Sequence, residues 1–184
     1  MKKWLVFMIL TFTIMGCDSI QETQTQENPS QVKSDTEEFS EPEPSEWVQY
    51  MKPVREYFYY RTHAAVKGDI QILWNRYPDL KNNVDPKTGV NNEEFEVISL
   101  RESFTLIDAN FDPESYERIK VKMVNDKEVI VLVHGHIGYL RDDFDDSGGE
   151  ILIKLFLEQK ENQWTVVKTD EYLIHEYKEW LKNK

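Results

Sequence analysis

Two histidines, two residues apart, are the first side chains in this sequence that could do chemistry. His134 and His136 lie in the stretch 128–140, the longest apolar and β-branched run of the chain. On a strand, residues i and i+2 point to the same face, so both imidazoles would face one way. Such a pair suits a general acid or base, a pocket wall, or two ligands of a metal. A metal would need a third ligand from His63, His175 or a carboxylate, so we expect no metal site here.

Other groups with catalytic potential are few. Asp69 follows Gly68, where a first helix is expected to end. An aspartate at this place can serve as an acid or base, but it is fully explained as a helix cap. The sequence has no Ser–His–Asp spacing, glycine-rich phosphate loop, HExxH or CxxC motif. The residues therefore favour binding over catalysis, and they predict no cofactor.

An acidic run at residues 142–150 contains four aspartates that could offer oxygen ligands to calcium. Its spacing differs from that of a calcium-binding loop, because Phe144 occupies a ligand position and no glycine stands at the sixth position. The run instead indicates an exposed acidic hairpin loop.

The first residues resemble a bacterial lipoprotein signal. Lys2 and Lys3 precede an apolar segment at 4–13, and Gly16 stands directly before Cys17, the sole cysteine. The apolar segment is shorter than the ~20 residues that a membrane span needs. The resemblance to the lipobox implies a signal peptide at 1–16 that is removed, followed by diacylglyceryl and palmitate-type acylation of the new terminal cysteine. It places the protein on the extracytoplasmic side of the cell membrane, held by lipid.

Residues 17–45 are expected to be a disordered acidic tether. Their large apolar residues are Ile20, Val32 and Phe39, which cannot bury enough surface to offset the entropy of ordering. Eight acidic residues against Lys33 give this segment a net charge of −7. The whole chain carries −12, which excludes nucleic acid as a partner.

Residues 46–184 are long enough for one domain, and their first half has helical periodicity. The first helix, 46–66, contains Pro53, so it either kinks there or begins near Lys52. A second helix is expected at 70–77. The apolar face of the first helix comprises Trp47, Met51, Val54 and Phe58.

A third helix should begin at Asn91 or Asn92, where Glu93 and Glu94 suit the positive end of its dipole. Its buried side should comprise Phe95, Ile98 and Leu100–Leu106, and residues 108–114 should form a loop. The pattern then changes to alternation typical of strands. The expected strands are 118–124, 128–140, 150–158 and 164–172, and a short terminal helix follows at 173–181.

This order of elements resembles the NTF2-like superfamily, also called SnoaL-like or ketosteroid-isomerase-like. The resemblance rests on the helix 46–66, the break at 67–69, the strand bearing His134-Gly135-His136 and Tyr139, and the hairpin 156–166. It implies an α+β, cone-shaped fold, in which three N-terminal helices pack against a curved four-stranded antiparallel sheet with a short C-terminal helix. Such folds host isomerases, dehydratases, cyclases and proteins that only bind or assemble.

If the sheet wraps the first helix, an apolar pocket with one or two polar groups should form between them. The residues predicted to line it are Phe58, Trp74, Leu132, His134, His136 and Phe156.

Three functional hypotheses follow. The leading one is a membrane-anchored, non-catalytic module that binds a small ligand, a peptide or a protein partner. The second is an isomerase- or dehydratase-type enzyme that uses His134, His136 or Asp69 as acid or base, although no buried Asp/Tyr pair is located in the sequence. The third is a structural surface protein that forms a homodimer through its sheet.

The lipobox predicts that Cys17→Ala retains full length and lacks acyl chains, because the acyl acceptor is missing. Detergent-phase partitioning with mass spectrometry measures both properties. A variant that still enters the detergent phase in a shortened form would show that the lipobox assignment is incorrect.

Overall fold

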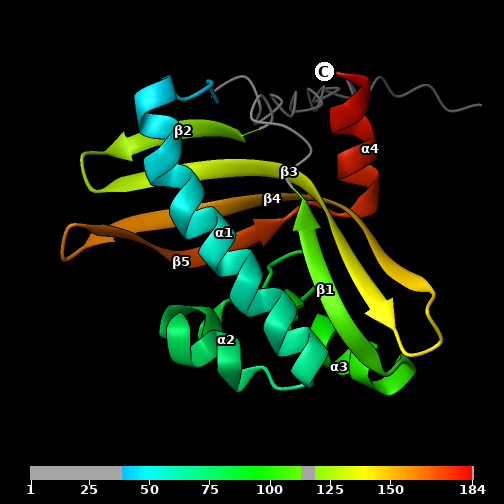
Figure 1. Ribbon diagram of the computed structural model, residues 1–184. Helices are drawn as coiled ribbons and strands as arrows, with labels where there is room; N and C mark the ends of the chain where they lie inside the picture. The colour runs from blue at the N-terminus through cyan, green and yellow to red at the C-terminus, as the bar shows by residue number, and fades with distance from the viewer. Residues whose placement is uncertain (1–38, 113–118, 184) are drawn as a thin grey trace, which may run out of the picture. The chain divides into compact units, whose positions relative to one another are not determined.

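The computed structural model describes residues 39–112 and 119–183 (Figure 1). The predicted signal peptide, Cys17 and most of the predicted tether lie outside these ranges. The elements in chain order are α1 (Pro44–Lys67), α2 (Gln71–Arg76), the 3-10 helix η2 (Pro78–Asn82), α3 (Asn92–Ser103), β1 (Leu106–Asp112), β2 (Ile119–Asn125), β3 (Glu128–Arg141), β4 (Asp146–Lys160), β5 (Gln163–Glu171) and α4 (Ile174–Lys182).

The sheet is organised around β3, the long strand that the sequence also marks as central. β4 pairs with β3 along nearly its whole length, and β5 pairs with β4. On the other edge of β3, β2 pairs with its first half and β1 with its second half. All pairings are antiparallel, and Figure 1 shows the sheet curving behind α1. The predicted order of the strands β2 to β5 is confirmed.

The fifth strand, β1, corrects the sequence-based prediction. The third helix was expected to reach Leu106, with a loop at 108–114, but α3 ends at Ser103 and the chain then enters a strand. The predicted buried side of this helix is also wrong at Phe95 and Ile98, which are exposed. The strand reads Leu-Ile-Asp-Ala-Asn-Phe-Asp, and Asp, Asn and Ala are poor strand formers. Its conformation comes from pairing with the second half of β3, which no local pattern could reveal.

Helix α1 runs without a break through Pro53 and begins two residues before the predicted start. Pro44 suits the first turn of a helix, because its missing N–H would have no partner there. The helix ends at Gly68, whose φ of 63° is left-handed and whose N–H donates to the Ala65 carbonyl at 3.1 Å. The predicted stop at this glycine is therefore confirmed.

The two faces of β3 have different coverings. Its odd-numbered residues from Val129 to Tyr139 face α1, and all but Gly135 belong to the hydrophobic core. Phe58 of α1 stacks on Phe111 of β1, with ring centroids 3.6 Å apart and planes 9° apart. The even-numbered residues face away from α1, and α4 packs on this outer face through His134.

Within the described residues, no helix is long and apolar enough to cross a membrane.

Phe58→Ala should lower the free energy of unfolding by about 3–5 kcal/mol, because it empties a fully buried aromatic site. Chemical denaturation measures this loss. The neighbouring substitution Tyr59→Ala is the control: Tyr59 is 61% exposed, so its removal should change stability by about 0.5 kcal/mol or less. Equal losses in the two variants would contradict the placement of Phe58 in the core.

Candidate functional site

A buried polar cluster lies between α1, α3 and the inner face of the sheet. At its centre is Arg61 of α1, which is only 3% exposed. Its Nε donates to Glu96 of α3 at 2.6 Å, and one of its terminal nitrogens donates to Glu171 of β5 at 3.0 Å. One guanidinium thereby joins a helix, a second helix and an edge strand.

Two tyrosine–glutamate pairs complete the cluster. Tyr57 donates its hydroxyl to Glu93 at 3.0 Å, and Tyr139 of β3 donates to Glu96 at 2.9 Å. The hydroxyl of Thr169 donates to the same Glu93 oxygen as Tyr57, at 2.6 Å. The other oxygen of Glu93, Oε2, is buried and has no hydrogen-bond partner among the described residues.

The surroundings shift the proton equilibria of this cluster. Burial raises the pKa of Tyr57 and Tyr139 far above the usual phenol value, and the nearby carboxylates add to this effect. Both hydroxyls therefore stay protonated and act as donors. Burial also raises the pKa of Glu171 above its ordinary value, although the guanidinium of Arg61 works in the opposite direction. Arg61 thus pairs with the carboxyl groups of Glu96 and Glu171, while Glu93 has an electrostatic influence on it without a direct ion pair.

Sequence reasoning missed this cluster. It searched for an Asp/Tyr pair, whereas the structure contains two Glu/Tyr pairs. Their glutamates lie on α3, where Glu93 and Glu94 read as favourable charges at a helix start. The available signal was the spacing of Glu93, Glu96 and Leu100 at i, i+3 and i+7, which places two carboxylates on the inward face of one helix.

The residues predicted to line one pocket are divided between the two faces of the sheet. Phe58 lies in the core on the α1 side, and Trp74 is half-buried on α2. Leu132, His134, His136 and Phe156 share the outer face, by the register of β3 with β4. Phe58 therefore lies apart from these four residues. It packs on the inner face of the sheet, whereas their side chains point to the outer face.

His134 is buried on the outer face, under α4. Its Nε2 lies 2.9 Å from the Tyr177 hydroxyl and 3.2 Å from Glu150 Oε2. The ring of Trp180 meets it edge to face, with centroids 5.0 Å apart. His136, two residues later on the same face, is exposed. The contacts of His134 attach the terminal helix to the sheet.

The remaining polar residues singled out in the sequence have local partners. Asp69 accepts the Gln71 N–H at 3.0 Å, as a turn-capping residue does. His63 stacks on Tyr59 of α1. In the acidic hairpin, Asp143 pairs with Arg141, and Phe144 projects into solvent with a φ of 66°. No group of three or more His, Cys, Asp or Glu side chains converges on a possible metal position in the described part of the chain.

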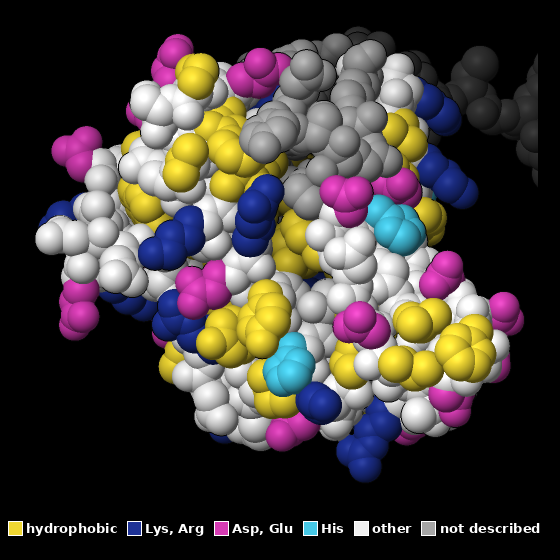
Figure 2. All heavy atoms as spheres, viewed as in Figure 1, with side chains coloured by type: hydrophobic (Ala, Val, Ile, Leu, Met, Phe, Trp, Pro, Cys, Tyr) yellow, Lys and Arg dark blue, Asp and Glu magenta, His cyan; other side chains and the backbone are white. Residues whose placement is uncertain are grey.

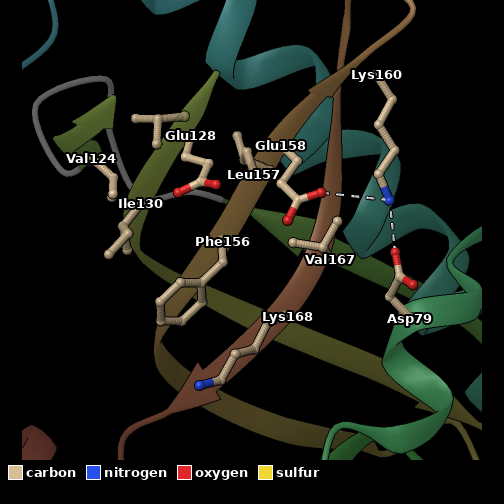
Figure 3. A pocket seen from close by; sticks show the side chains of 11 residues that line it. Asp79, Val124, Glu128, Ile130, Phe156, Leu157, Glu158, Lys160, Val167 and Lys168 are labelled. Atoms are coloured by element: carbon tan, nitrogen blue, oxygen red, sulfur yellow. Dashed lines mark hydrogen bonds and ion pairs between the residues drawn. The ribbon is translucent and has the colours of Figure 1, made fainter. Parts of the chain in front are cut away.

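An open groove of about 450 Å³ lies on the outer face, at the end of the sheet away from α4 (Figure 3). Ile130 and Phe156 form part of its floor, and the ammonium of Lys168 lies 4.9 Å from the Phe156 ring centroid. At one rim, Lys160 bridges Asp79 at 2.8 Å and Glu158 at 3.7 Å. The groove thus combines an apolar floor with charged walls of both signs. Phe156 is the predicted pocket residue that lines it.

The architecture defines the class of fold: the domain is α+β, with helices followed by an open antiparallel sheet and a short C-terminal helix. Aln2 from a Streptomyces species is similar at 9% identity over 79% of this chain and 100% of its own, with a TM-score of 0.51. An NTF2-like superfamily protein from Salmonella enterica is similar at 9% identity over 70% and 92%, with a TM-score of 0.46.

The association domain of C. elegans CaMKII is similar at 12% identity over 71% of this chain and 100% of its own, with a TM-score of 0.46. Identities this low establish likeness of fold alone. No family model matches the sequence, and no curated protein matches it.

The raised pKa of Glu171 predicts a specific pH dependence. A carboxyl whose pKa rises on folding binds more protons in the folded than in the unfolded state, so its contribution to stability is lost as the pH rises. Glu171→Gln cannot ionise. Its stability relative to wild type should therefore increase as the pH is raised above the ordinary value of 4.5, in denaturation series at stepped pH.

Glu176→Gln is the control with the opposite sign. Burial alone would raise the pKa of Glu176, but the Leu173 N–H and Lys87 lower it below its ordinary value. The stabilising contribution of Glu176 is therefore lost as the pH falls, and this variant should gain on wild type at low pH. The same slope in both variants would contradict the assigned environments.

Proposed function

We propose that this protein is a lipid-anchored, extracytoplasmic lipoprotein whose NTF2-like domain is a non-catalytic binding module for a peptide or protein partner. Acylated Cys17 would hold it to the cell membrane, and the partner would bind in the outer-face groove. The groove is the observation that carries the proposal, because it exposes an apolar floor between charged walls.

The interior supports a binding role rather than catalysis. The main polar groups of the interior already have protein partners. Arg61 donates to Glu96 and Glu171, and the hydroxyls of Tyr57 and Tyr139 donate to Glu93 and Glu96. A substrate would have to replace these bonds, at a cost of several kcal/mol for buried charged groups. The α1 side also offers less to a partner, since its hydrophobic side chains occur in separate groups among charged ones (Figure 2).

An isomerase- or dehydratase-type enzyme is the second candidate, and one observation favours it. Glu93 Oε2 is a buried carboxylate oxygen without a partner among the described residues. The other oxygen of the same carboxyl group accepts the Tyr57 hydroxyl. A proton-transfer site has this composition. For such an enzyme, Glu93→Gln would abolish turnover, whereas for a binding module it would leave partner binding unchanged.

A homodimer through the outer sheet face is the third candidate. α4 already covers the part of that face around His134, which leaves the groove end for self-association. Sedimentation of wild type and Phe156→Ala separates this candidate from binding to a different partner.

The proposal predicts that a photo-crosslinking amino acid in place of Phe156 captures a partner in intact cells. The same replacement at Tyr59, which is exposed on the α1 side, should capture it at least about tenfold less, because the crosslinker reaches only neighbouring atoms. Immunoblotting of the adducts measures the ratio.

Cys17→Ala in the Phe156-crosslinker background completes the design. If the lipid places the domain beside its partner, the adduct should disappear when the anchor is lost. Equal capture from both positions, or an adduct composed only of a second copy of the chain, would refute the proposed binding mode.

A further inference from the structure

Two irregularities in the strand pairing shape the outer-face groove. Val124 of β2 has no partner on β3, because the register shifts by one residue between Met123 and Asn125. Val167 of β5 is likewise an extra residue, since the register with β4 shifts directly after Phe156. Both valines line the groove, one on each side of its floor (Figure 3). Such bulges redirect side chains and often lie beside functional sites, so the groove is built by departures from regular pairing.

One carboxylate in the groove has no counterion. Glu128 and Glu158 are register partners on β3 and β4, and both side chains line the groove. Like charges at directly opposite positions destabilise a sheet. Glu158 lies 3.7 Å from Lys160, whereas Glu128 forms no ion pair with any residue that the structure describes. The carboxylate of Glu128 is therefore available to a cation from a partner.

The positive end of the groove lies on the other side of the floor. Lys168 of β5 is the register partner of Phe156 and holds its ammonium over that ring. Because β3 and β5 flank β4, Glu128 and Lys168 stand on opposite sides of Phe156, as Figure 3 shows. A cationic group that enters the groove is thus attracted at one side and repelled at the other. The charged side chains of the lining sum to a net charge of −1, and they are Asp79, Glu128, Glu158, Lys160 and Lys168.

The strand repeat sets the distance between the apolar and the acidic contacts. Ile130 pairs with Phe156, and Glu128 pairs with Glu158, so the apolar floor and the acidic pair are successive steps along the same face. Residues two apart on a strand are separated by ~7 Å. An extended peptide has the same repeat, and its side chains at i and i+2 point to one face. Two such side chains can therefore contact the floor and the acidic pair together.

We propose that the groove binds an extended segment of the partner in which a lysine or arginine stands two residues from a large apolar side chain. The apolar side chain rests on Ile130 and Phe156, and the cation pairs with Glu128. This contact also offsets the repulsion between Glu128 and Glu158. Lys168 disfavours the opposite placement of the cation, which gives the segment one orientation. The inference rests on the proposed function, because it names the chemistry of the partner for the same groove.

Charge reversal in the chain that carries the photo-crosslinking amino acid at position 156 tests the inference. Glu128→Lys should lower the adduct in intact cells by at least about tenfold, because it places a like charge beside the partner's cation. Glu102→Lys is the matched control: it makes the same change at an exposed position of α3 outside the groove, and the adduct should persist. Thermal denaturation of both variants verifies that they remain folded.

Mass spectrometry of the crosslinked peptide supplies the second measurement. The partner segment should contain a lysine or arginine two residues from the crosslinked side chain. An adduct that is insensitive to Glu128→Lys, or a segment without that basic residue, would overturn the inference and leave the groove as a binding site. If the chain with Glu128 intact forms no adduct at all, the proposed function is refuted, and this inference with it.

Discussion

The buried guanidinium of Arg61 is the interaction on which the geometry of this domain depends. It lies inside the fold and holds Glu96 of α3 and Glu171 of β5 from a single position on α1. Removing these charges from water is expensive, so they are compatible with folding only when their partners are correctly placed. The helices and the edge strand must therefore meet in one arrangement, which the aromatic core around Phe58 and Phe111 reinforces.

The same interaction limits what the interior can do. Burial raises the pKa of Glu171, the neighbouring carboxyl groups of Glu96 and Glu93 add to this effect, and Arg61 opposes it. Tyr57 and Tyr139 donate into the cluster and stay protonated, so the polar atoms there are largely engaged with one another. The space between α1 and the sheet is occupied by this network and by aromatic rings. The proposed binding site is therefore the open groove on the outer face, which Phe156 and Lys168 line.

The length of β3 links these two sides. β2 pairs with its first half, β1 pairs with its second half, and β4 pairs with both halves. Side chains from the one strand therefore reach the core at Tyr139, the α4 contact at His134 and the groove at Ile130. The alternation of the strand separates Tyr139 from the other two residues, because odd- and even-numbered side chains face opposite directions. His134 and Ile130 share the outer face and are separated by their positions along the strand.

Much of the fold could be predicted from local sequence. The apolar spacing of α1, the stop at Gly68, the order of strands β2 to β5 and the terminal helix are all visible as periodicity and turn chemistry. These features depend on residues close together in the chain. Even the internal Pro53 was recognised, although the sequence could not decide between a kink and a later start.

What only the tertiary structure decided involves partners distant in sequence. β1 is a strand because β3 offers it an edge, in spite of its Asp, Asn and Ala residues. Phe58 and His134 lie on opposite sides of the sheet because register, and not composition, assigns each side chain to a face. The hydrogen bonds of the Arg61 cluster join residues up to 110 positions apart. The helical spacing of Glu93 and Glu96 indicates that both face inward, but it does not reveal which partners they meet there. Local patterns report the short-range preferences of the backbone, whereas the candidate site arises from long-range packing and desolvation, which exist only in the folded chain.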